Sequence, residues 1–478
     1  MGDNFSGIAR GVADRLAVSA GARVSVPRWS PRAAAGAAAA LLFSLPGHAV
    51  ANGYQDLHQS AQGLGTAYAV NGAGITDITA MFSNPASIAR FDGSWAAGVA
   101  SIILPKDTFE DLRATAPFSG APVTGTPPRP RQFLGNAPGA GAFVTHQFSD
   151  RLFFGLAFTV PWATKSNYPD TAVSRYTAVD TQLRAYNLNP VVAYKASDTV
   201  SFAVGPAFQL YTAEFSTAVD PTGGIAASPA TDLLSRIKAH NTSVGFTAGL
   251  EWQATPATRV GISYRSRVAH KFEGDLALTS TNPASFSRLD AGVLAVTGRR
   301  LTGPTANADF KINTPSIATF GVSQAVTPKL DLYASAQLVG WHFFRDTRVT
   351  YDNGLPETVV DNNWHDSWYV AGGAGFRPSE TLQLRAGIAY DWTPTPDRVR
   401  NPRAPNADRI YAGVGATYEP SESGWKVDVA YGHTFFKDAP IDLAGGNNTP
   451  RGTLHGISQI DANIFMAQFT MNLDRLFR

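Results

Sequence analysis

The sequence predicts an all-β chain, a fourteen-stranded antiparallel transmembrane β-barrel with a small N-terminal helical hatch, or plug, in its lumen. Three observations support this fold class. Apolar and polar residues alternate over many segments, short connections alternate with long ones, and no apolar run beyond the first 51 residues is long enough for a membrane helix. The mean hydropathy of -0.09 agrees, because alternating barrel strands average to neutral.

Composition excludes several functional classes. The chain has 478 residues and no cysteine, which rules out a thiol enzyme and a cysteine-ligated zinc site. A formal charge of +2 is too small to indicate a nucleic-acid partner. The histidines are scattered, and neither a Gly-x-Ser-x-Gly elbow nor a metal-type cluster is found. We therefore expect no enzyme, no cofactor and no metal.

Residues 1–51 have the pattern of a secretory signal peptide. Five arginines precede a short apolar core over 33–45, and Ala49-Val50-Ala51 forms a cleavage site. The mature chain is expected to begin at Asn52, after export through the Sec pathway. Cysteine-free chains are compatible with an oxidising compartment.

Alternation is clearest in 382–390, where Leu382, Leu384 and Ile388 share one face and Gln383 and Arg385 share the other. A soluble β-sandwich would alternate too. Aromatic residues recur at strand ends, however, as they do in the interfacial girdles of an outer-membrane barrel. These residues are Trp95, Phe148, Trp252, Trp341, Trp368, Trp392 and Trp425.

The connections predict the strand number. Short links lie near 149–151, 195–199, 254–258, 324–330, 377–381 and 419–424, and long ones near 105–138, 168–183, 215–242, 273–308, 345–366, 393–408 and 435–459. Six short turns and seven long loops join fourteen strands over a barrel domain of 95–478. Short periplasmic turns and long external loops are typical of outer-membrane barrels.

Residues 52–94 precede the barrel and show no strand alternation. Short helical pieces are expected at 65–70 and 75–82, and a third with Ser83 or Asn84 as N-cap and Pro85 at the first helical position. Asn84-Pro85-Ala86 could be an ordinary turn. A barrel of this girth has a lumen to fill, so we interpret 52–94 as a hatch inside it.

Pro161-Trp162-Ala163 interrupts the predicted third strand, which runs from Leu152 to about Lys165. Proline has no N–H for a ladder, so it belongs on edge strands or at bulges. Because a closed barrel has no edge, we expect a local break in strand pairing here.

The mature chain resembles the FadL family of outer-membrane transporters for long-chain fatty acids and other hydrophobic compounds. "SAQGLGTAYA" (60–69) and "DITAMFSNPASIARFD" (77–92) are the most specific matches, and "FGLAFTVPWATKSNYPD" (154–170) and "DRIYAGVGATYEP" (408–420) extend them. The resemblance implies capture in external loops, binding next to the hatch, a shift of the N-terminus, and lateral exit at a kink in the third strand. Asn84, Pro85 and Ala86 would then belong to the hatch, and Pro161, Trp162 and Ala163 to the gate.

Two sets of residues are candidates for substrate binding. Loops 215–242 and 273–308 are the family's capture region, and "ATDLLSRIKA" (230–239) predicts an amphipathic turn of helix with Leu233, Leu234 and Ile237. A buried carboxylate would need a basic partner, and parity points Arg265, Arg267, Arg385 and Lys426 inward. "LYTAEF" (210–215) is acidic where fatty-acid members are expected to be basic.

The substrate therefore stays open between a long-chain fatty acid and a monoaromatic hydrocarbon of the toluene type. A general diffusion porin is a further alternative, which the hatch disfavours. We expect a monomer in the outer membrane of a Gram-negative cell. Its partners would be the hydrophobic substrate, membrane lipid, lipopolysaccharide and the barrel assembly machinery. The aromatic signal for that machinery would be Phe477, which is penultimate and followed by Arg478 where a terminal aromatic residue is usual.

Overall fold

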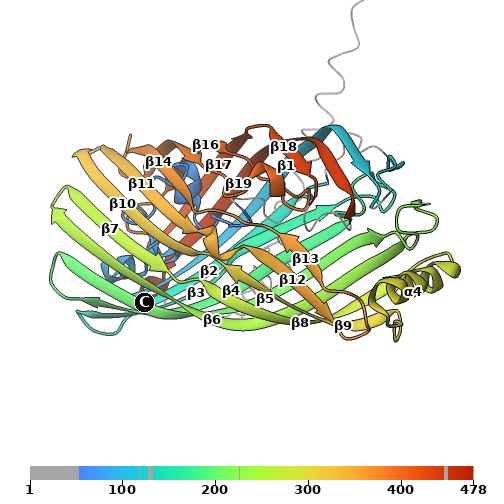
Figure 1. Ribbon diagram of the computed structural model, residues 1–478. Helices are drawn as coiled ribbons and strands as arrows, with labels where there is room; N and C mark the ends of the chain where they lie inside the picture. The colour runs from blue at the N-terminus through green and yellow to red at the C-terminus, as the bar shows by residue number, and fades with distance from the viewer. Residues whose placement is uncertain (1–52, 118, 127–132, 226, 446–450, 477–478) are drawn as a thin grey trace, which may run out of the picture. The chain divides into compact units, whose positions relative to one another are not determined.

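The structure is a computed structural model that describes residues 53–117, 119–126, 133–225, 227–445 and 451–476 (Figure 1). The predicted signal peptide and Phe477 lie outside these residues. Within the described ranges, no helix combines the length and apolar character needed to cross a membrane.

In the part of the chain that the structure describes, a single antiparallel sheet of nineteen strand segments closes on itself through pairing of β1 with β19. The segments are Ser94–Thr115 (β1), Ala137–Gln147 (β2), Leu152–Asn167 (β3), Asp180–Lys195 (β4), Val200–Val219 (β5), Leu233–Thr255 (β6), Thr258–Arg265 (β7), Val268–Thr279 (β8), Thr305–Thr314 (β9), Ser316–Thr327 (β10), Leu330–Gly340 (β11), Asp346–Tyr351 (β12), Thr358–Asp361 (β13), Ser367–Phe376 (β14), Leu382–Asp391 (β15), Arg409–Tyr418 (β16), Trp425–Phe436 (β17), Ala439–Leu443 (β18) and Thr453–Asn472 (β19).

These segments form the predicted closed barrel of fourteen strands, because five strands are interrupted along their length. β7 continues as β8, because β6 pairs with both. β9 continues as β10, because β9 pairs with β8 and β10 pairs with β7. The other interrupted strands are β11 with β12, β13 with β14, and β17 with β18. Pro315, which has no N–H to donate, separates β9 from β10.

The predicted alternation is confirmed on the barrel wall. In β15 the outward Leu384 and Ile388 are 44% and 59% exposed, while the inward Gln383 and Arg385 are buried. Large apolar side chains that face outward all round a closed sheet identify a lipid-facing surface.

The hatch fills part of the lumen with three short helices, α3 (Ala61–Gly65), η1 (Ile78–Phe82) and η2 (Pro85–Arg90). The helix expected at 65–70 is wrong, because Ala67 and Tyr68 adopt left-handed backbone angles (φ 45° and 60°) that end α3 at Gly65. The piece expected at 75–82 is a 3₁₀ helix that starts only at Ile78.

Wall glycines let the hatch approach the barrel closely. A Cβ on Gly261 would lie 1.9 Å from the Gly72 carbonyl oxygen, and one on Gly387 would lie 2.0 Å from the Thr66 oxygen. The glycine-rich inner faces of the strands are therefore a steric requirement of the hatch. One continuous core joins the hatch to the wall and includes Leu57, Leu64, Tyr68, Ile78, Met81, Ile88, Phe143, Phe153, Tyr369 and Tyr411.

The external loops contain α4 (Ala284–Thr297) and a short 3₁₀ turn, η4 (Asp397–Val399). A second 3₁₀ turn, η3 (Trp341–Phe343), lies at the interruption between β11 and β12, and α5 (Leu473–Leu476) follows the last strand. The helical turn expected at 230–239 is wrong, because Leu233 already begins β6, which pairs with β5 from its first residue. Leu233 and Ile237 still share a face, since a four-residue spacing preserves the face in a strand as well.

Candidate functional site

Two neighbouring strands of the wall separate in their outer halves. β2 and β3 are paired from Gln147↔Phe153 to Ala142↔Phe158. Beyond that point β2 pairs with β1 and β3 pairs with β4, and among the described residues no further β2–β3 pair is recorded. We call this region, residues 137–141 of β2 and 159–167 of β3, the seam.

The break coincides with the predicted interruption in the third strand. The β3–β4 register shifts between Thr159 and Trp162, which places a bulge at Val160 and Pro161. The proline cannot donate a ladder hydrogen bond, and the bulge turns this stretch of β3 away from its regular path. The stretch around Pro161 and the loss of β2–β3 pairing therefore lie at the same position along β3.

The first residues of the hatch occupy the inner side of the seam. The Asp56 N–H donates to the Pro161 carbonyl over 2.7 Å, and the Ala163 N–H donates to the Tyr54 carbonyl over 2.9 Å. Gln59 reaches the other rim, because a Cβ on Gly141 would lie 3.1 Å from its Oε1. We call Tyr54–Gln59 the plug segment, since it takes the pairing position that β2 leaves vacant.

The plug segment also carries a buried histidine–carboxylate pair. Nδ1 of His58 lies 2.6 Å from Oδ1 of Asp56, and the His58 backbone N–H donates to the same oxygen over 2.8 Å. The pair locks the turn that follows the bridge to β3.

Asn84 caps η2 and ties the hatch to the far wall. Its Oδ1 accepts from the Ala86 N–H over 3.1 Å, and its Nδ2 donates to the carbonyls of Gly72 (2.8 Å) and Leu250 (3.0 Å). Leu250 belongs to β6, so Asn84 does not face the seam. Of the two predicted N-caps, Asn84 is the one observed, and the prediction of Pro85 at the start of this helix is confirmed.

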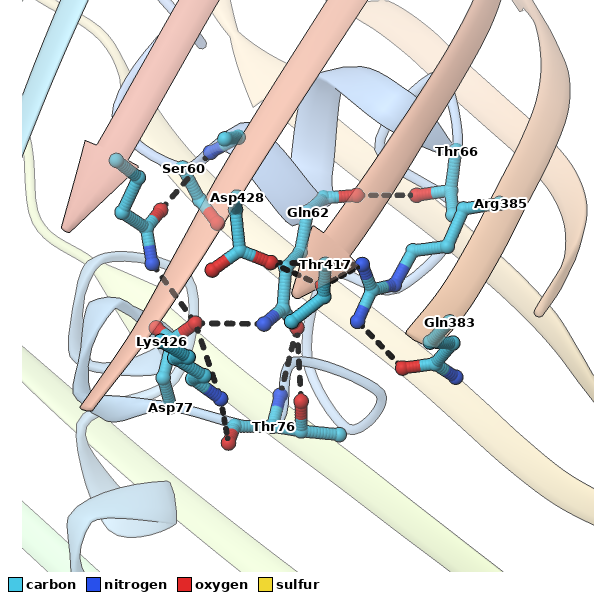
Figure 2. A network of polar contacts seen from close by, with 12 residues as sticks. Ser60, Gln62, Thr66, Thr76, Asp77, Gln383, Arg385, Thr417, Lys426 and Asp428 are labelled. Atoms are coloured by element: carbon cyan, nitrogen blue, oxygen red, sulfur yellow. Dashed lines mark hydrogen bonds and ion pairs between the residues drawn. The ribbon is translucent and has the colours of Figure 1, made fainter. Parts of the chain in front are cut away.

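A buried polar network anchors the middle of the hatch to β15–β19 (Figure 2). Oδ2 of Asp77 accepts from Gln62 (2.7 Å) and Gln468 (2.8 Å), and Nζ of Lys426 donates to the Thr76 carbonyl over 2.8 Å. Figure 2 shows Arg385 and Asp428 in the same network, with an ion pair of 3.5 Å. This region of the hatch is fixed by charge-assisted bonds, unlike the plug segment.

A cavity of about 810 Å³ lies among the external halves of the strands and the loops. That volume is in the range of small-molecule sites. Tyr54 of the plug segment lines it, together with Trp364 and Phe344. The remaining lining is largely aliphatic and aromatic, and includes Leu183, Ile237, Leu276, Leu278, Val293 and Phe310.

Tyr54 lies at the boundary between the cavity and the seam. Its ring is held edge-on by Trp341 at a centroid distance of 5.0 Å and by Trp162 at 6.1 Å. Its carbonyl is the group that accepts from β3. A ligand that pushes on this side chain therefore acts directly on the residue that holds the plug segment against the seam.

Two arginines from different external loops line the cavity. Arg403 donates to the Asp180 carbonyl (2.8 Å), Thr181 Oγ1 (2.7 Å) and the Ser216 carbonyl (3.1 Å), all of them neutral acceptors. For Arg451, no side-chain hydrogen bond or ion pair is recorded with any described residue. The pair lies within the apolar lining without a carboxylate in contact.

Burial and mutual repulsion shape the charge of this pair. Burial is the main cause that lowers the pKa of Arg403, and the guanidinium of Arg451 lowers it further. Burial also lowers the pKa of Arg451, against the opposing effect of Tyr351 and Asp361 nearby. The two acids that line the cavity are engaged elsewhere, Asp220 within its own turn and Glu357 with Arg348 at 3.2 Å. An anion entering the cavity would therefore be attracted.

The predicted basic residues lie outside this cavity. Arg265 faces inward as expected, but it stacks on Phe82 of the hatch at 4.7 Å. Arg385 faces inward into the polar network. Arg267 is exposed, contrary to the parity expectation, because the interruption at Ser266 shifts the alternation between β7 and β8.

Of the predicted apolar set, Ile237 lines the cavity, Leu233 is buried and Leu234 is on the outer face of β6. Sequence reasoning did not single out Tyr54, Arg403 or Arg451. Tyr54 lies at the start of the predicted mature chain, and the arginines lie in predicted external loops. The sequence offered one signal for the two arginines, which was the presence of basic residues in loops that can fold back over the lumen.

Comparison with known proteins identifies the family of this chain. The family model described as "Outer membrane protein transport protein (OMPP1/FadL/TodX)" matches residues 42–473. A long-chain fatty acid transport protein of Escherichia coli O6:H1 is 25% identical over 394 residues, covering 79% of this chain and 85% of the relative.

Two solved structures have the same fold. A FadL homologue from Pseudomonas aeruginosa superposes with a TM-score of 0.78 at 25% identity, over 88% of this chain and 99% of that one. The Ralstonia pickettii toluene transporter TbuX gives a TM-score of 0.58 at 14% identity, over 84% and 97%. This chain belongs to the OMPP1/FadL/TodX family of outer-membrane proteins that transport hydrophobic compounds.

Proposed function

We propose that this member of the family is a passive channel for long-chain fatty acids. The main support is the arginine pair in the large apolar cavity. A hydrocarbon chain would bury its methylene groups against the lining at about 0.8 kcal/mol each. The carboxylate would meet Arg403 and Arg451, and no side-chain hydrogen bond or ion pair of Arg451 to the described residues is recorded. Charge-assisted hydrogen bonds of this kind are stronger than neutral ones.

In the proposed mechanism, the ligand then displaces the plug segment. Two backbone hydrogen bonds hold this segment to β3, Asp56 to Pro161 and Ala163 to Tyr54. At a net 0.5–1.5 kcal/mol each, they contribute roughly 1–3 kcal/mol, which ligand binding can offset. The chain would leave through the seam into the membrane, so that its apolar surface does not have to cross water.

A monoaromatic hydrocarbon is the second candidate. The aromatic residues around Tyr54 and the largely apolar lining would suit such a ligand, and the toluene transporter TbuX shares the fold. A hydrocarbon has no group for the arginines, however, and burying two cations beside an uncharged ligand is costly. This is why the fatty acid is the preferred substrate.

Uptake in a porin-poor host separates the alternatives. Cells expressing the protein are supplied with labelled oleate, toluene or a small sugar, and a version lacking residues 52–94 serves as the comparison. We expect oleate uptake by the full protein, and sugar uptake only when the hatch is missing. Toluene uptake without oleate uptake would favour the second candidate, and sugar uptake by the full protein would favour a porin.

A further inference from the structure

The outer face of β6 marks where the lipid-facing band ends. From the periplasmic side it presents Trp252, Leu250, Ala248, Phe246 and Val244 outward. The next outward residues are Thr242, His240, Lys238 and Arg236. The change from apolar to polar between Val244 and Thr242 places the outer membrane interface at this level.

Two lysines stand side by side directly above this boundary. Lys271 of β8 and Lys311 of β9 are register partners, and both side chains are exposed on the outer face. The height of Lys271 relative to β6 follows from two side-chain hydrogen bonds. Asn241 of β6 donates to the Lys271 carbonyl (2.7 Å), and Ser243 of β6 donates to the Ala269 carbonyl (2.8 Å). At about 3.3 Å per residue, the lysines start roughly two residues above the band.

A third cation extends the group toward the membrane. Arg267 is exposed on the same side, and its guanidinium packs over the Phe343 ring at 4.4 Å. We call Arg267, Lys271 and Lys311 the cationic patch. In Figure 1, β8 and β9 extend beyond β7 and β10 toward α4, that is, toward the external end of the barrel.

The patch is not neutralised by the protein. No side-chain ion pair or hydrogen bond is recorded for Lys271 or Lys311 with any residue in the described part of the chain. The nearest acids, Glu273 and Asp309, form the next cross-strand pair and are also opposite each other. Like charges directly opposite in a sheet are destabilising. Neither lysine forms a recorded ion pair with Glu273 or Asp309, although both acids are described.

The stability of the sheet alone does not explain two successive pairs of like charges. Exchanging one lysine with one acid would give two attractive pairs with the same composition. The lysines lie at the depth of lipid headgroups, where an anionic group would neutralise them. We propose that the cationic patch binds the phosphate groups of a phosphorylated glycolipid of the outer leaflet, of the lipopolysaccharide type.

The test uses the purified full-length mature protein in detergent. Binding of a short-chain lipopolysaccharide is measured by native mass spectrometry for the wild type and for Lys271→Gln with Lys311→Gln. The matched control is Lys195→Gln with Lys329→Gln, two lysines near the short turns at the opposite end of the barrel. We expect a loss of roughly fivefold per lysine in the patch variant and no loss in the control.

Three further ligands, each tested with the wild type and the patch variant, decide between ligand sources. Dephosphorylated lipopolysaccharide should bind the wild type as weakly as intact lipopolysaccharide binds the patch variant. Phosphatidylglycerol or inorganic phosphate binding with the same patch dependence would overturn the glycolipid assignment in favour of any phosphate. Equal lipopolysaccharide binding by wild type and patch variant would overturn the site. A lipid-free dimer that the patch variant disperses would identify the face as a subunit interface instead.

Discussion

Replacing Arg451 by glutamine should weaken the binding of a fatty acid and spare that of its alcohol. Arg451 lines the apolar cavity, and no hydrogen bond of its side chain to the described residues is recorded. The substitution therefore removes no recorded hydrogen bond that holds the loops. A hydrogen bond to a charged group contributes about 1.5–3 kcal/mol, and about 1.4 kcal/mol corresponds to tenfold in affinity. We expect oleate to bind roughly 10- to 150-fold more weakly.

The assay is equilibrium binding of labelled oleate and oleyl alcohol to the purified protein. Arg398→Gln is the control, because Arg398 is exposed and lies in the same loop as Arg403. Arg403→Gln is less clean, since it also removes three hydrogen bonds to β4 and β5. Unchanged oleate affinity in Arg451→Gln, or an equal loss for oleate and oleyl alcohol, would refute the assignment of the arginine pair to the carboxylate.

Three further outcomes are expected. Oleate affinity should fall as the pH rises past the pKa of Arg403, about 9, because a neutral guanidinium no longer attracts the carboxylate. Oleyl alcohol affinity, measured in the same titration, should stay constant. Glu251→Gln should loosen the hatch, since Glu251 is buried with Arg90 at 2.7 Å and breaking a buried pair costs about 3–5 kcal/mol; faster proteolysis of the hatch in an intact barrel would show it, and unchanged proteolysis would count against it. Asn84→Ala should have a similar but smaller effect, about 1–3 kcal/mol, because it removes a helix cap and two bonds to carbonyls; equal hatch protection in wild type and variant would contradict this.

The barrel could be predicted because its determinants are local. Alternation fixes which face of a strand meets lipid, and turn length fixes which end lies outside, so both are visible in a single sequence. The cap at Asn84 and the break at Pro161 are equally local, since each follows from the chemistry of one residue.

The cavity could not be predicted because it is assembled from distant segments. Tyr54, Arg403 and Arg451 come together only through the path of the external loops. Arg267 shows how a single irregular position defeats a parity argument, because the interruption at Ser266 changes the face of every later residue. Residues 230–239 show that a four-residue apolar spacing fits a strand as well as a helix.

Movement of the plug segment is the central claim, and a reversible cross-link tests it most directly. Gln55 and Trp162 are bridge partners, so their Cα atoms should be about 4.5–5.5 Å apart, which suits a disulfide. The chain has no other cysteine, so Gln55→Cys with Trp162→Cys can form only this bond within the molecule. Oleate uptake by cells should be blocked in the oxidised protein and recover on reduction, while each single variant is indifferent to reductant. Equal uptake before and after reduction would contradict exit through the seam.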